Sequence, residues 1–143
     1  MSDPAPLPTL APAIRDFLGA TPPLFCTLAT TNADGSAHQT VLWFALRDDG
    51  TLLLNGMPGR RWVENLRREP RCSLLAGDAY RWVSVRGTTT PVTDDAQAHA
   101  DIEALTHRYH AADPATIERA IAMFRGQPRI SFTLRPRAVT DHL

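Results

Sequence analysis

Short β-like segments separated by tight turns constrain the fold of this chain more than any other feature. The first turns contain Asp34-Gly35 and Asp49-Gly50, and Asp-Gly pairs favour tight hairpin connections. The predicted strands cover residues 24–30, 37–46, 51–56, 71–77, 80–90 and 130–135. Because short turns join the first three strands, they are expected to form an antiparallel meander.

Helical patterns interrupt and follow these strands. The predicted helices cover residues 10–18, 58–69, 95–110 and 114–124. Gly19 is a candidate C-cap for the first helix, and Asp94-Asp95 and Asp113-Pro114 are start signals for the last two. Six strands with helices at the edges predict a mainly β, antiparallel barrel and not a parallel doubly wound sheet.

Length and composition favour one folded domain. A chain of 143 residues can bury a core of its own, and we expect a single domain over residues 10–143. Residues 1–9, MSDPAPLPT, are poor in apolar residues and are predicted to be disordered.

The charge balance and the lengths of the apolar runs narrow the choice of partners. Fifteen arginines cancel fifteen acidic residues, so no overall positive field favours nucleic acid or anionic lipid. Apolar runs such as residues 41–46 are much shorter than a membrane span, and the N-terminus lacks the pattern of a secretory signal. A cytoplasmic location is therefore expected, with no nucleic-acid or membrane partner.

Familiar catalytic and metal-binding motifs are missing. The sequence contains no GxGxxG, GxSxG, P-loop or HExxH pattern. Cys26 and Cys72 lie in apolar stretches and are interpreted as buried free thiols, while His99, His107 and His110 are interpreted as surface residues of one helix. No metal site is expected, and no catalytic acid or base is identified.

Arg60 and Arg61 are the most informative residues. The pattern places both guanidinium groups in the first turn of a helix, where the helix dipole disfavours cations unless an anion is present. Free backbone N–H groups at that end bind phosphate, and arginine adds bidentate hydrogen bonds. A phosphorylated ligand would explain the pair, and a solvated face with acidic neighbours is the alternative.

Four segments between Leu28 and Gly87 carry a family resemblance, and they read LATTNADGSAH, TVLWF, GRRWVENLRREPRCSLL and YRWVSVRG. In this order they resemble the pyridoxamine-phosphate-oxidase-like superfamily, in particular its class B branch of flavin and deazaflavin oxidoreductases. The resemblance implies a six-stranded antiparallel split β-barrel of the FMN-binding type, and a homodimer with coenzyme sites at the subunit interface. It also implies the coenzyme F420, with FMN as the alternative.

The same resemblance implies which residues hold the coenzyme. By position, Arg60 and Arg61 look like the phosphate-binding residues at the start of the helix. The wall beside the ring and ribityl chain would comprise His38, Thr40, Asn55, Gly56 and Met57. For His38, a solvated or hydrogen-bonded imidazole is an equally weighted alternative.

Trp62 departs from the family pattern, because members that bind F420 usually carry lysine at this position. Arg61 could supply the missing charge, Trp62 could reshape the pocket, or the coenzyme site could be lost. An indole there could also stack on a coenzyme ring, although tryptophan on the apolar face of a short helix favours a core position.

Three functions are compatible with the sequence. The first is an F420H2-dependent reductase that transfers a hydride from the deazaflavin to a small organic acceptor. The second is an FMN-dependent oxidase or reductase, and the third is a non-catalytic flavin- or haem-binding carrier or sensor.

Overall fold

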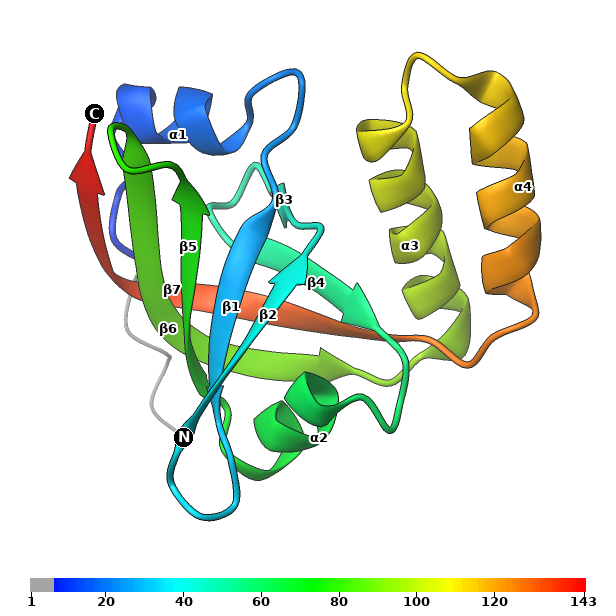
Figure 1. Ribbon diagram of the computed structural model, residues 1–143, viewed down its shortest axis with the longest axis horizontal. Helices are drawn as coiled ribbons and strands as arrows, with labels where there is room; N and C mark the ends of the chain where they lie inside the picture. Colours follow the sequence, from blue (N-terminus) through cyan, green and yellow to red (C-terminus); the bar gives the residue numbers. More distant parts are fainter. Residues whose placement is uncertain (1–6) are drawn as a thin grey trace.

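The computed structural model describes residues 7–143 and shows a curled antiparallel sheet with helices at its margins (Figure 1). The strands within this part of the chain are β1 (Cys26–Thr31), β2 (Ala37–Leu42), β3 (Ala45–Leu46), β4 (Leu52–Gly56), β5 (Arg71–Gly77), β6 (Trp82–Val92) and β7 (Ile130–His142). The helices there are α1 (Pro12–Leu18), α2 (Arg61–Arg68), α3 (Asp95–Tyr109) and α4 (Pro114–Arg125). The predicted mainly β fold with flanking helices is confirmed.

The order of the strands explains the curl of the sheet. Neighbouring strands follow the order β2-β1-β5-β6-β7-β4-β3, so β2 and β3 lie at opposite ends of that order. In the chain, however, only Trp43 and Phe44 separate these two strands. Because one short segment contributes both end strands, the sheet curls until its ends approach each other, as in a barrel.

The predicted count of six strands is wrong, because the expected strand over 37–46 divides into β2 and β3. Its first half pairs with β1, and its second half pairs with β4. At the break, the Phe44 N–H donates to the Tyr109 hydroxyl oxygen (3.1 Å), and Arg108 Nε donates to the Phe44 carbonyl (3.1 Å). Side chains of α3 therefore replace strand partners at Phe44.

The predicted meander is wrong for the same reason. β4 pairs with β3 and with β7, and it has no pairing with β2. The last strand is also longer than the predicted 130–135, since β7 pairs with β6 as far as His142. Both differences come from pairing between strands that are distant in sequence, which local patterns do not encode.

The predicted helix starts at Asp94 and Asp113 are confirmed. Asp94 accepts a hydrogen bond from the Gln97 N–H (2.8 Å), and Asp113 accepts one from the Thr116 N–H (3.1 Å). The predicted C-cap of α1 is confirmed at Gly19. Of the segment 1–9 predicted to be disordered, residues 1–6 lie outside the described residues.

Two clusters of buried apolar residues stabilise this arrangement. The larger fills the curled sheet and includes Phe44 and Phe132, each with no exposed surface. The smaller lies between α3 and β4 and consists of Leu53, Ile102 and Leu105. Figure 1 shows α3 and α4 packed side by side beyond β4, with α2 beneath β2. No helix over residues 7–143 combines the length and apolar content needed to cross a bilayer.

Close packing of Gly56 on Trp62 gives the first testable prediction. A Cβ atom on Gly56 would lie 2.3 Å from Cζ2 of the Trp62 indole, which is itself buried in the core. Replacing Gly56 with alanine is expected to cost about 1–3 kcal/mol of unfolding free energy, because it overpacks this contact. Chemical denaturation measures the change.

Gly126→Ala is the matched control, since its Cβ would approach nothing closer than 3.6 Å. This variant is expected to change the unfolding free energy by less than about 0.5 kcal/mol. Equal effects of the two alanine substitutions would contradict the predicted overpacking.

Candidate functional site

A polar cavity of about 320 Å³ lies where the ends of β2 and β4 meet the turn before α2. Its lining residues are Thr40, Val41, Leu42, Asn55, Gly56, Met57, Arg60, Trp62 and Arg129. The cavity thus brings together six of the eight residues that the sequence predicted for the coenzyme. The other two, His38 and Arg61, do not line it.

His38 and Arg61 lie close to this cavity along the chain but border other surroundings. His38 is half-buried on the same face of β2 as Thr40 and Leu42, opposite Thr30 of β1. Arg61 faces a second hollow of about 430 Å³. That hollow is also lined by Asn32, Ala33, Asp34, Ser36, Asn65 and Arg68. Adjacent in sequence, the two arginines therefore face different hollows.

The N-terminal end of α2 lacks a side-chain cap. Arg60 is the N-cap residue and makes no side-chain hydrogen bond to the first turn. The carboxylate of Glu64, in the first turn, does not cap the helix, because its Oε2 accepts from the Gly59 N–H (3.0 Å), one residue before the cap. Within residues 7–143, no hydrogen bond reaches the backbone N–H groups of residues 61–63. These donors remain available to an anion.

Positive charge is concentrated beside this helix end. Within the described chain, neither Arg60 nor Arg61 forms an ion pair with an acidic side chain. Burial lowers the pKa of the Arg129 guanidinium, and the nearby charge of Arg60 lowers that pKa further. Two cations that repel each other across one cavity favour a bound anion.

Sequence reasoning missed Arg129, which enters the cavity from the connection between α4 and β7. Its Nε donates to Asn55 Oδ1 (3.0 Å), and its Nη1 donates to Gln127 Oε1 (3.1 Å). The guanidinium carbon also lies 4.9 Å from the centre of the Phe124 ring. No pattern around Arg129 indicates a site, because Asn55, which orients it in the cavity, lies in a distant part of the chain.

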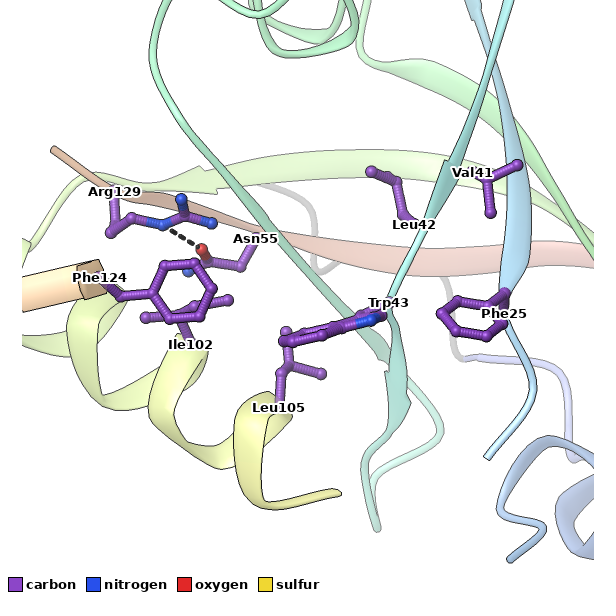
Figure 2. Close-up of a pocket in the computed structure, with 9 residues that line it drawn as sticks. All are labelled: Phe25, Val41, Leu42, Trp43, Asn55, Ile102, Leu105, Phe124 and Arg129. Carbon is purple, nitrogen blue, oxygen red and sulfur yellow. Dashed lines mark hydrogen bonds between the residues drawn. The ribbon is translucent and has the colours of Figure 1, made fainter. Parts of the chain in front are cut away.

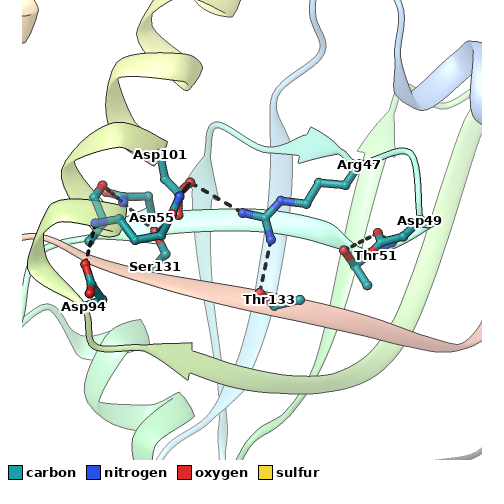
Figure 3. Close-up of polar contacts among 10 residues, drawn as sticks. Arg47, Asp49, Thr51, Asn55, Asp94, Asp101, Ser131 and Thr133 are labelled. Atoms are coloured by element: carbon teal, nitrogen blue, oxygen red, sulfur yellow. Dashed lines mark hydrogen bonds and ion pairs between the residues drawn. The ribbon is translucent and has the colours of Figure 1, made fainter.

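A buried network fixes the side chain of Asn55 (Figure 3). Asn55 Nδ2 donates to the Ala98 carbonyl (2.9 Å) and to Ser131 Oγ (3.0 Å). Ser131 in turn donates to Asp101 Oδ2 (2.7 Å), and Asp101 pairs with Arg47 at 3.5 Å. Since both amide protons of Asn55 are used within the protein, its oxygen is left to orient Arg129.

A third hollow, of about 300 Å³ and with an apolar lining, adjoins the polar cavity, and we name it the aromatic cavity (Figure 2). Its lining residues are Phe25, Val41, Leu42, Trp43, Asn55, Ile102, Leu105, Phe124 and Arg129. Four of these residues also line the polar cavity, including Asn55 and Arg129. The Trp43 ring stacks on Tyr109, with centroids 5.0 Å apart, and forms a T-shaped pair with Phe124.

Trp62 is a core residue, as predicted from its place on the apolar face of the helix. Only 5% of its surface is exposed, and its ring lies 5.7 Å from that of Phe132. The indole also forms part of the wall of the polar cavity. A cavity thus remains beside Trp62.

The two cysteines are not positioned as nucleophiles. Burial raises the pKa of both Cys26 and Cys72 to about 12, and the thiolate is the reactive form. At pH 8 the folded protein is expected to react with a thiol reagent more slowly than the urea-unfolded chain, by about tenfold or more. Spectroscopic titration with a disulfide reagent measures the rates, and immediate modification of both folded-state thiols would contradict the expectation.

Comparison with family models gives a match over most of the chain. The sequence model described as pyridoxamine 5′-phosphate oxidase matches residues 10–141. A crystal structure of a conserved hypothetical protein from Mycobacterium tuberculosis is similar at 24% identity with a TM-score of 0.77, over 99% of this chain and 89% of that one. No curated protein matches the sequence significantly.

Two further solved structures have informative descriptions. One is described as an F420 reductase, with 25% identity and a TM-score of 0.70, over 92% of this chain and 98% of that one. The other is a FAD-binding protein from Mesorhizobium loti, with 22% identity and a TM-score of 0.62, over 94% of this chain and 96% of that one. At this level of identity, the second similarity shows the fold alone.

Proposed function

Because this chain belongs to the pyridoxamine 5′-phosphate oxidase family, we propose that it is an oxidoreductase whose flavin-type coenzyme binds with its phosphate at Arg60. One observation carries the proposal. Arg60 and Arg129 border one cavity beside free N–H groups at the start of α2, and Arg60 has no acidic partner among residues 7–143. A phosphate group would neutralise the positive charge of the arginines and would accept hydrogen bonds from the free N–H groups.

The residues present suit this group. Arg60 and the first turn of α2 bind the phosphate oxygens, and Asn55 holds Arg129 at the boundary between this cavity and the aromatic cavity. Gly56, Met57 and Trp62 form one wall, while Thr40 of β2 forms the other. When bound, a reduced coenzyme of this type supplies a hydride to an organic acceptor. The adjoining aromatic cavity offers the acceptor an apolar surface.

F420 is the coenzyme that we propose first. The solved structure described as an F420 reductase shares 25% identity with this chain. In F420 the phosphate is itself a phosphodiester that leads on to a polyglutamate tail, and this tail calls for further cations. Arg61 and Arg68 line the neighbouring hollow and would meet that tail.

FMN is the second candidate, and the observation that favours it is Trp62 at the position of the usual lysine. FMN ends in one phosphate, which Arg60 and the start of α2 satisfy without a further cation. The non-catalytic carrier or sensor remains the third candidate, because a buried Trp62 narrows the polar cavity.

A homodimer completes this proposal. Phe25 and Val41 line the aromatic cavity, yet their side chains are 58% and 66% exposed. A second subunit that covers this apolar rim would bury them and close the cavity. Sedimentation of the purified protein tests the assembly, and a monomer at micromolar concentration would contradict it.

Titration with F420 and with FMN tests the proposed function. F420 is expected to bind with submicromolar affinity, and FMN is expected to bind more weakly. The fluorescence of the coenzyme reports its binding. Tight binding of FMN alone would favour the second candidate. Failure of both coenzymes to bind would contradict the proposal and favour the carrier or sensor.

A further inference from the structure

Among residues 7–143, one charged group lines the aromatic cavity, and that group lies at its boundary with the polar cavity. Arg129 lines both cavities, together with Asn55, Val41 and Leu42. Figure 2 shows its side chain beside Asn55 at one end of the aromatic cavity, with Trp43 and Phe25 toward the other end. The remaining walls are carbon surfaces contributed by Ile102, Leu105 and Phe124.

The orientation of Arg129 is fixed by neutral groups. Asn55 Oδ1 and Gln127 Oε1 accept from Nε and Nη1, and the Phe124 ring lies beneath the guanidinium carbon. Over residues 7–143, no carboxylate pairs with Arg129 and no hydrogen bond engages its Nη2. A half-buried cation held by neutral partners keeps both its charge and a free donor for a ligand.

The apolar walls define the rest of that ligand. Trp43 is held flat against Tyr109, and Phe124 meets it edge-on, so the cavity offers rigid ring surfaces. Such surfaces favour flat, apolar molecules. A second charge on the ligand, away from Arg129, would be buried without a partner.

We infer that the aromatic cavity binds a flat, largely apolar substrate that carries one anionic group, and that Arg129 binds this group. The inference rests on the proposed function only for the identification of this molecule as the acceptor. With its anionic edge at Arg129, the substrate lies at the boundary that the two cavities share, next to the coenzyme in the polar cavity.

Isothermal titration calorimetry with 2-naphthoate and 2-naphthamide, without coenzyme, tests the inference. The two probes share one flat ring system, and only the acid carries a charge. The wild-type protein is expected to bind naphthoate about tenfold or more tightly than naphthamide, as for a charge-assisted hydrogen bond. Equal affinities would overturn the proposal, and this comparison needs no variant.

Arg129→Gln is expected to remove the preference for the acid and to leave naphthamide binding within about threefold. Arg125→Gln is the matched control, because this exposed arginine ends α4 and pairs with Glu103 outside the cavity. It should leave both affinities unchanged. If Arg129→Gln does not fold, Arg129→Lys replaces it and should retain most of the preference. An Arg129→Gln variant that folds and binds naphthoate as tightly as the wild type would overturn the role of Arg129, and so would an Arg129→Lys variant that folds and has lost the preference for the acid.

Two further readouts locate the probe. In NMR spectra, naphthoate should shift the indole N–H signal of Trp43, assigned with Trp43→Phe, and leave that of Trp82 in place, since Trp82 lines a different hollow. An unmoved Trp43 signal would overturn the proposal. Saturating F420 or FMN should leave naphthoate bound, and displacement would assign this cavity to the coenzyme instead. If neither coenzyme binds, the proposed function fails while the naphthoate result still decides this inference.

Discussion

Replacing Arg60 with alanine is expected to weaken coenzyme binding by about 1.5–3 kcal/mol, the loss typical of a hydrogen bond to a charged group. Arg60 is the N-cap of α2 and lines the polar cavity, so its removal deletes both a donor pair and a cation. Since Arg60 is exposed and makes no ion pair with the described residues, the fold should tolerate the change. Fluorescence titration of the variant with F420 or FMN measures the loss.

Arg67→Ala provides the control on the same helix. Arg67 lies in the last turn of α2, where its guanidinium is 3.8 Å from Glu64, and it lines none of the hollows described above. Both variants lose one positive charge, so a general electrostatic effect would weaken both equally. Unchanged affinity in Arg60→Ala, or an equal loss in Arg67→Ala, would show that the phosphate is bound elsewhere.

Replacing Phe44 with alanine is expected to have the largest effect on stability, about 3–5 kcal/mol of unfolding free energy. Phe44 has no exposed surface and lies in the dipeptide between β2 and β3, which contribute the two ends of the curled sheet. Its loss leaves a cavity in the larger core cluster at the point where the sheet closes. Urea denaturation measures the change.

Tyr80→Ala is the control for this variant, because it also removes an aromatic ring, yet Tyr80 is 82% exposed. It should change the unfolding free energy by less than about 0.5 kcal/mol. A similar loss in both variants would contradict the role assigned to the buried segment between β2 and β3.

Local signals in the sequence predicted most of the elements. The Asp-Gly turns are present, with Gly35 and Gly50 at φ values of 87° and 88° that favour glycine. The aspartate caps of α3 and α4 form as expected. These features succeed because each depends on residues within a few positions of one another.

Non-local pairing explains what the sequence did not reveal. The split between β2 and β3 depends on Tyr109 and Arg108, which lie more than sixty positions from Phe44. Likewise, Arg129 becomes part of the candidate site because the fold brings it next to Asn55. The two residues are 74 positions apart in the sequence. Arg60 could be predicted from the family resemblance, since the matching segments span the strand and helix that border the polar cavity.

A crystal structure of the protein with bound F420 or FMN would show where the coenzyme phosphate is held. Phosphate oxygens are expected within hydrogen-bonding distance of the Arg60 guanidinium and of the backbone N–H groups in the first turn of α2. A coenzyme bound elsewhere, with the Glu64 carboxylate turned over that helix end, would contradict the account.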